Sequence, residues 1–532
     1  MSLSCRSQFL RIGKIGLVSL TLVFVSLLGA LDSIAQQIRV VPSISVLEQY
    51  DSNVFFAPKS QLSAGTKADD LITTITPQLN FSHGNTLVKT NLSLGAVVQK
   101  FAHNSALDNV GVNASGGVDL SQAVNRVLPR MKAFRIFGTY RYSPSAPVFG
   151  AGGVGGGVGG GGFGTGGIGI AGPVDSGLLT QRIRTTMYSA GLADSYSLSP
   201  TTDFQTTYTY SQLSFGGTLA PTTTTAGPTA QTVFDTTTHS ISAGPSSRIT
   251  AIDTLTVKYT FVQTSQAQFG DFTMHGGNLG WGRSWTKEWS SSVNGGLTLI
   301  EPIPDTSSSG GQRRVPATMF PTGGFSLSYA SGSSFLRKLG SEIQEVTGTS
   351  GSTPMGGNFL PILSGMNMPG GIAAPGSYRV TLLYNLGVFP SFVQSAGPIY
   401  THTVSLASAA GITDKLTAQA MFNFARSSFT SDAIGTTFTT YGTTVSLNYL
   451  ITPTFTARLS HQWLMFENQT SGISAGDLGF AKQVILFGFT YAYAPRGDFF
   501  RSGAFWEGAS GSSSSAEAGA GKSGTGGVDT KK

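Results

Sequence analysis

The chain has 532 residues, of which only 11% are charged, and its formal net charge is +7 at pH 7. A typical soluble domain has about 25% charged residues, so this composition is unusual for one. The mild positive charge is not gathered in any Lys/Arg-rich run, which argues against a nucleic-acid partner. The only cysteine, Cys5, lies in the first segment. We therefore expect no disulfide, thiol nucleophile or thiolate metal site in the rest of the chain.

Residues 1–35 have the pattern of a cleavable signal peptide. An apolar stretch runs from Ile15 to Leu31, and the small residues of Ser33-Ile34-Ala35 form a cleavage site. Three basic residues precede the stretch, Arg6, Arg11 and Lys14. This order predicts export and a mature chain that begins at Gln36. An uncleaved membrane anchor is the alternative interpretation.

Beyond this segment, apolar and polar residues alternate with a period of two in most of about eighteen segments. Successive strand residues point to opposite faces, so this period predicts β-strands with one apolar face. We expect strands at 38–50, 70–82, 86–101, 107–121, 130–143, 182–198, 202–215, 234–248, 252–268, 271–285, 288–301, 318–331, 378–389, 399–411, 414–430, 436–450, 453–466 and 481–494.

The length of these segments points to a membrane rather than to a soluble sandwich. Strands of soluble domains average about 5–6 residues, whereas a tilted strand needs about 9–11 residues to cross a bilayer. Past the signal, no apolar run is long enough to span as a helix. We predict an all-β fold over residues 36–495, a transmembrane antiparallel up-and-down β-barrel with about 18 strands (range about 16–20).

The connections between the expected strands alternate between short and long. Short turns include Ser82-His83-Gly84-Asn85 and Gly411-Ile412-Thr413-Asp414, and long connections include 51–69 and 302–317. Outer-membrane barrels have short periplasmic turns and longer outer loops, so a periplasmic N-terminus places these short turns in the periplasm. The irregular insertion 332–377 breaks the rule, because it is long and falls on the same side. A hidden strand pair there would raise the count to 20.

Two segments have low complexity. Residues 147–181 contain a glycine-rich stretch from Phe149 to Gly172, which we expect to form a flexible outer loop. A loop folded into the lumen as a constriction is the sharper alternative. The Gly/Ser/Ala-rich tail, residues 496–532, is predicted to be disordered.

The sequence shows no catalytic or cofactor motif, so we expect neither an enzyme nor a cofactor. The six histidines have no metal-ligand spacing, and His461 beside Ser460 is weak evidence for a hydrolase. Asp69 and Asp70 flank a strand start. A solvated pair is the simpler interpretation of these two carboxylates, and a loop calcium site is the other.

The first expected strand and its loop carry a resemblance to known proteins. The segment Val41–Phe55 ends in the cluster Tyr50, Asp51 and Asn53, and Thr76-Pro77-Gln78-Leu79 follows. This pattern resembles the first strands of porin-like β-barrel families, some of which accompany exopolysaccharide and exosortase systems. The resemblance implies an outer-membrane barrel without fixing its substrate. Asp51 and Asn53 also suit a turn where a strand leaves the membrane.

The last expected strand carries a second resemblance. Gly488, Tyr491 and Tyr493 are similar to the assembly signal on the final strand of bacterial barrels, with a glycine followed by alternate aromatic residues. The segment departs from that signal because Leu486 stands at a usually polar position and the chain continues to Lys532. The interfacial aromatic girdle of any such barrel is the alternative interpretation of these tyrosines.

These patterns predict a porin-like channel in the bacterial outer membrane that passes solutes or polymer passively. Four basic residues are candidates to face its lumen, Lys89, Arg135, Arg141 and Lys258. A satisfied lumen charge is the simpler interpretation of each, and anion selectivity is the other. The expected partners are outer-membrane lipid, the barrel-assembly machinery and a polysaccharide or small solute. The alternative is a closed structural barrel linked to cell-surface polysaccharide or biofilm assembly.

Overall fold

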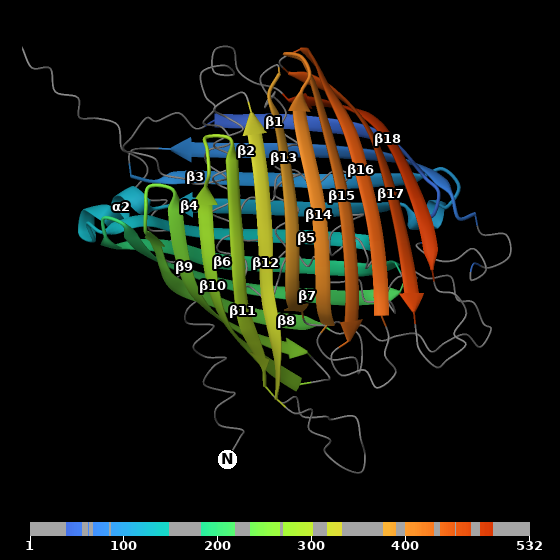
Figure 1. Cartoon of the computed structure of the whole chain (residues 1–532). Helices are drawn as coiled ribbons and strands as arrows, with labels where there is room; N and C mark the ends of the chain where they lie inside the picture. Colours follow the sequence, from blue (N-terminus) through green and yellow to red (C-terminus); the bar gives the residue numbers. More distant parts are fainter. Residues whose placement is uncertain are drawn as a thin grey trace, which may run out of the picture.

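The fold is a closed antiparallel β-barrel. A computed structural model describes residues 39–55, 62, 67–84, 87–147, 182–218, 235–266, 270–301, 317–331, 376–389, 399–429, 437–452, 454–469 and 479–492. Within these ranges, 18 strands form a single sheet that curls around until its last strand returns to its first (Figure 1). The predicted signal peptide, the tail and nearly all of 147–181 and 332–377 lie outside the described residues.

Each expected strand corresponds to an observed one, so the predicted fold class is confirmed. The bounds differ by only a few residues at each end. The strands are β1 (Arg39–Asp51), β2 (Asp70–Gly84), β3 (Lys89–Phe101), β4 (Asn109–Asp119), β5 (Met131–Pro147), β6 (Arg182–Ser199), β7 (Thr202–Thr218), β8 (Thr236–Arg248), β9 (Asp253–Gln266), β10 (Gly270–Ser284), β11 (Trp289–Ile300), β12 (Thr318–Ser331), β13 (Tyr378–Phe389), β14 (Ile399–Gly411), β15 (Leu416–Phe429), β16 (Thr437–Thr452), β17 (Phe455–Gln469) and β18 (Phe480–Ala492).

The barrel is closed by the pairing of β1 with β18. Their antiparallel register runs from Ser43 opposite Ala492 to Asp51 opposite Val484, while the other edge of β1 pairs with β2. Every described strand therefore has a neighbour on both sides. Such closure leaves no edge of unpaired backbone N–H and C=O groups, which a bilayer would not tolerate.

The two faces of the wall differ in polarity as the period-two pattern predicts. On β9, the exposed Val257 and Tyr259 alternate with the buried Lys258 and Thr260. On β18, Ile485 and Phe487 are each 47% exposed, whereas the intervening Leu486 is fully buried. Phe489 and Tyr491 continue the exposed face, and Tyr493 lies outside the described residues. Exposed leucine, valine and aromatic side chains recur on other strands, including β3, β9 and β11. The outward face is thus an apolar surface suited to lipid.

Outward tyrosines on three strands pair with histidines on the neighbouring strand. The phenolic oxygen lies 3.0 Å from Nδ1 in the pair Tyr208–His239, and 2.7 Å in Tyr259–His275. A third such pair, Tyr384–His402, has a separation of 3.0 Å. Aromatic side chains with a polar tip favour the boundary between the apolar core of a bilayer and water. These pairs therefore mark one interfacial belt.

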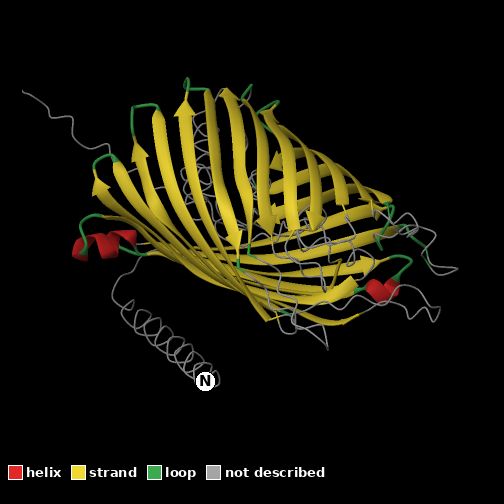
Figure 2. Cartoon of the chain, turned by 60° about the horizontal axis from the view of Figure 1, so that its bottom comes forward, coloured by secondary structure: helices red, strands yellow, loops and turns green. Residues whose placement is uncertain are grey.

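The two ends of the barrel have different connections, and Figure 2 shows one short helix at each end. The short-turn end carries tight turns such as 200–201 and 412–415 and the helix α2 (Ser121–Val127). The loop end carries the connections 52–69 and 148–181 and the 3-10 turn η3 (Ser105–Leu107). Neither helix was expected from the sequence. No helix in the described ranges is long and apolar enough to cross a membrane.

The long connection 332–377 joins β12 to β13, and connections from an even-numbered to an odd-numbered strand lie at the short-turn end. This is the side on which the sequence placed it. Residues 332–375 are not described, so a further strand pair there is not tested. Eighteen described strands already close the sheet. The wall needs no additional pair to be complete.

Gly488 occupies a tight position in the closing seam. A Cβ atom added there would lie 2.3 Å from Leu47 Cδ2 and 2.5 Å from the Val46 carbonyl oxygen. We expect Gly488→Ala to destabilise the barrel by about 1–3 kcal/mol, because overpacking forces the backbone to shift. Guanidinium titration of protein refolded into lipid vesicles measures this change. Gly277→Ala is the matched control, since nothing lies within 4 Å of its added Cβ.

An equal loss of stability in Gly488→Ala and Gly277→Ala would contradict this account of the seam. It would show that the destabilisation does not come from crowding between β1 and β18.

Candidate functional site

The inward face of the wall is lined largely by neutral hydroxyl groups. These side chains alternate with the exposed apolar residues and are themselves buried. They include Thr74, Thr76, Ser242, Thr260, Thr298, Ser326, Thr381, Thr401, Ser405, Ser446 and Ser460. Hydroxyl groups both donate and accept hydrogen bonds, so this face suits water and polar solutes rather than lipid.

All four basic residues predicted to face the lumen lie on this inward face. Lys258 is buried between the exposed Val257 and Tyr259, and Arg141 follows the exposed Tyr140. Lys89 and Arg135 flank Asp119 in one row across β3, β4 and β5. That they line an open channel stays a prediction.

Arg135 has a structural partner. Its Nε lies 3.4 Å from Asp119 Oδ2, and Asp119 Oδ1 accepts a hydrogen bond from the Ser121 N–H at 2.9 Å. The Ser121 hydroxyl in turn accepts from the Phe134 N–H at 2.9 Å. This network fixes the start of α2 against β5. Arg135 therefore helps to hold the barrel wall together and also adds a positive charge to the inward face.

Three more inward basic residues were missed by the sequence analysis, although the same alternation identifies them. Arg379 and Lys482 are buried, and Arg458 precedes the exposed Leu459. Inward carboxylates of the described strands lie instead at strand ends, at Asp51, Asp70, Asp119 and Asp203. The inward acidic groups thus lie at the rims, whereas inward basic groups occur both at the strand ends, as at Lys89, Arg379 and Lys482, and farther along the strands, as at Arg141 and Lys258.

At the loop end, residues from β1, β2, β18 and the connection 102–108 form a compact group that we call the rim cluster. It comprises Asp51, Asn53, Asp70, His103, Asn104, Asp108 and Lys482. Its first element is an ion pair between Lys482 Nζ and Asp51 Oδ2 at 2.7 Å, in which both side chains are buried. Asp51 Oδ1 also accepts a hydrogen bond from the Asn53 N–H at 3.0 Å. The pair links the first strand to the last, and the backbone contact turns the chain after β1.

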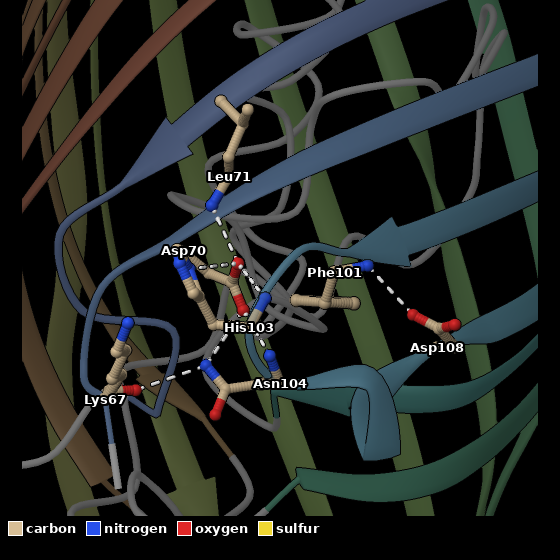
Figure 3. Close-up of polar contacts among 7 residues, drawn as sticks. All are labelled: Lys67, Asp70, Leu71, Phe101, His103, Asn104 and Asp108. Atoms are coloured by element: carbon tan, nitrogen blue, oxygen red, sulfur yellow. Dashed lines mark hydrogen bonds and ion pairs between the residues drawn. The ribbon is translucent and has the colours of Figure 1, made fainter.

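Asp70 is the centre of the rim cluster (Figure 3). Its Oδ1 accepts from the N–H groups of Leu71 at 2.8 Å and His103 at 2.9 Å. Its Oδ2 accepts from the Asn104 backbone N–H and side-chain amide, both at 2.8 Å. Burial would raise the pKa of Asp70, but these hydrogen bonds outweigh it and hold the pKa below its ordinary value.

Asp108 ties the same connection to β3. Its carboxylate lies 2.7 Å from Lys100 Nζ. It also accepts a hydrogen bond from the Phe101 N–H at 2.8 Å (Figure 3). The hydrogen bond from Lys100 is the main cause of a lowered Asp108 pKa, followed by that from Phe101. Beneath these contacts, Val54, Ile72, Phe101 and Leu107 form a buried apolar cluster. The connection is thus held both by charge and by packing.

The expectation that Asp69 and Asp70 form a solvated pair is wrong for Asp70. Asp69 is exposed, but Asp70 is 1% exposed and already accepts four hydrogen bonds. No group of three or more potential metal-ligating residues occurs in the described part of the chain. The carboxylate therefore serves as a structural anchor for the loop.

Ser460 and His461 do not form a catalytic pair in this wall. Ser460 is buried on the inward face, whereas His461 is exposed on the opposite face of β17. Neighbouring strand residues point to opposite sides, so the imidazole cannot take a proton from that hydroxyl.

Comparison with solved structures finds weak likenesses over most of the chain. The outer membrane protein opdK from Pseudomonas aeruginosa is 10% identical, with a TM-score of 0.37 over 86% of this chain and 99% of that one. OccAB3 from Acinetobacter baumannii is 8% identical, with a TM-score of 0.36 over 85% and 99%. OprD from Pseudomonas aeruginosa is 10% identical, with a TM-score of 0.36 over 86% and 96%.

No protein-family model matches the sequence, and no curated protein is significantly similar to it. TM-scores this low give no basis for transferring a substrate or a role to this chain. The porin-like architecture stands on the barrel itself, with its 18 paired strands and its two contrasting faces.

Replacing Asp70 tests the rim cluster. Asp70→Asn puts an amide group where two oxygens accept four hydrogen bonds, and we expect a loss of about 1.5–3 kcal/mol, the size of a hydrogen bond to a charged group. Guanidinium titration in lipid vesicles gives the stability, and limited proteolysis of 102–108 reports on the loop. Asp69→Asn, at the exposed neighbour, should change stability by less than about 0.5 kcal/mol. Equal effects of the two substitutions would contradict the anchoring role.

The rim cluster also predicts a pH dependence. A carboxyl group with a lowered pKa in the folded state adds stability above its unfolded pKa and loses it as pH falls through the folded pKa. The stability difference between the wild type and Asp70→Asn should stay constant between about pH 5 and 7. It should shrink only below the ordinary aspartate value of 3.8. A difference that already falls near neutral pH would contradict the lowered pKa of Asp70.

Proposed function

We propose that this chain is a porin-like channel of the bacterial outer membrane, through which solutes or polymer pass without an energy source. The observation that carries the proposal is the contrast between an apolar outward face and an inward face of hydroxyl and basic groups, in a wall closed by 18 strands. Barrels of about 16–18 strands are wide enough to enclose an aqueous channel. The predicted signal peptide supports export to that membrane.

The charge of the inward face favours anions. Arg141 and Lys258 lie in the middle of their strands, whereas the inward acidic residues of the described part lie at the strand ends. Asp51 and Asp119 are each engaged by a basic side chain. Rings of basic side chains select anions in pores, so small anionic solutes are the proposed substrate class.

One observation favours the closed structural barrel as a second candidate. Several inward side chains, such as Thr74, Thr260 and Ser405, are at most 1% exposed. A wide water-filled lumen would leave such side chains in contact with solvent. A closed barrel linked to cell-surface polysaccharide or biofilm assembly is consistent with this burial.

Single-channel recording separates the two candidates. The mature chain, Gln36 to Lys532, is refolded and inserted into a planar bilayer with a salt gradient. We expect steady conductance and a reversal potential that shows anion preference, because inward basic groups outnumber free carboxylates. Folded protein that gives no conductance would overturn the channel proposal.

Deletion of 150–172, within the glycine-rich connection at the loop end, addresses gating separately. If this stretch restricts the lumen, we expect the deletion to raise conductance without changing the strand pairing. Unchanged conductance together with altered surface adhesion of cells that express the variant would favour the interaction role. Heat-modifiable migration on gels checks that the deletion variant is folded, with the wild type run in parallel as the control.

A further inference from the structure

Arg379 is a buried charge on the inward face at the short-turn end of β13. It is 2% exposed, and it lies between the outward residues Tyr378 and Val380, which are 44% and 38% exposed. The alternation of the strand therefore directs the guanidinium toward the interior of the barrel.

The guanidinium of Arg379 has few partners. Its Nε donates to Thr381 Oγ1 at 3.3 Å, whereas Nη1 and Nη2 have no hydrogen-bond acceptor. No carboxylate forms an ion pair with it among the described residues. A buried charge without compensation is strongly unfavourable, so the arrangement requires a counter-ion.

The surrounding wall does not supply one. The six strands from β11 to β16 contain no aspartate or glutamate, and their only other basic residue is Arg426, which is exposed. The side chains beside Arg379 in its row are Ala330 on β12 and Ala409 on β14. Both are too short to reach the guanidinium and have no polar atom, so neither can accept a hydrogen bond from Nη1 or Nη2.

Thr381 provides a second donor beside the guanidinium. Its Oγ1 accepts from Arg379 Nε and from Ser328 Oγ at 3.2 Å, so its own proton points elsewhere. Two parallel Nη donors in a planar fork match the oxygens of a carboxylate or phosphate group. A hydroxyl donor beside them suits a third oxygen contact.

We propose that Arg379, with Thr381, forms a binding site for an oxyanion, meaning a carboxylate or phosphate group, at the short-turn end of the inward face. The site deepens the proposed function because it names the chemistry that an anionic solute would present to the wall. It does not require conduction, because a closed barrel could hold the same anion. The two proposals therefore fail independently.

Anion-dependent stability tests the site directly. Wild type, Arg379→Gln and Arg379→Lys are refolded in detergent, dialysed into chloride and titrated with sodium phosphate or sodium acetate at constant ionic strength. We expect the unfolding temperature of the wild type to rise and saturate. Arg379→Gln should lose this saturable rise, and Arg379→Lys should need about tenfold more anion, because lysine lacks the planar fork. In chloride alone, Arg379→Gln should be at least as stable as the wild type, since it removes an uncompensated charge.

The two salts separate the possible sources of the oxyanion. A rise with acetate alone indicates a carboxylate site, a rise with phosphate alone indicates a phosphate site, and a rise with both indicates a general oxyanion site. Arg426→Gln is the matched control and should titrate like the wild type. An identical response of the wild type and Arg379→Gln, or no saturable response in the wild type, would overturn the proposal.

Discussion

The structure depends on one constraint, the need to pair every backbone N–H and C=O group of a wall that faces lipid. A sheet meets this constraint only by closing on itself, and here the closure is made by β1 and β18. Two features act at that seam. Gly488 permits close approach to Leu47, and the buried pair of Lys482 and Asp51 joins the two strands at the loop end.

Closure also sorts the side chains into two environments. Because residues alternate along each strand, one set must face lipid and the other the interior. The outward set is apolar with a belt of Tyr–His pairs, and the inward set is rich in hydroxyl and basic groups. Carboxylates on the inward face occur at the strand ends, where Asp70 and Asp108 organise the connection 102–108.

Much of this fold was predictable from local sequence, because an alternating strand such as β12 or β14 carries its own period and its own turns. The observed bounds of both equal the expected ones. The helix α2 was not predicted, since its seven residues are too few for a helical period and depend on the Asp119–Ser121 contact. The burial of Asp70 was missed because its donors His103 and Asn104 lie more than 30 residues away. The uncompensated charge of Arg379 could likewise not be predicted from local sequence, since it depends on Ala330 and Ala409 on the two neighbouring strands.

The central claim is that the inward face of this wall is in contact with water. Single cysteines at Ser93, which is inward and only partly buried, and Leu94, which is outward, test it in a Cys5→Ser background. Protein in lipid vesicles is treated with a charged, membrane-impermeant thiol reagent. The account predicts labelling at position 93 and protection at position 94. Protection at both positions would show an interior closed to water, and labelling at position 94 alone would contradict the assignment of the two faces.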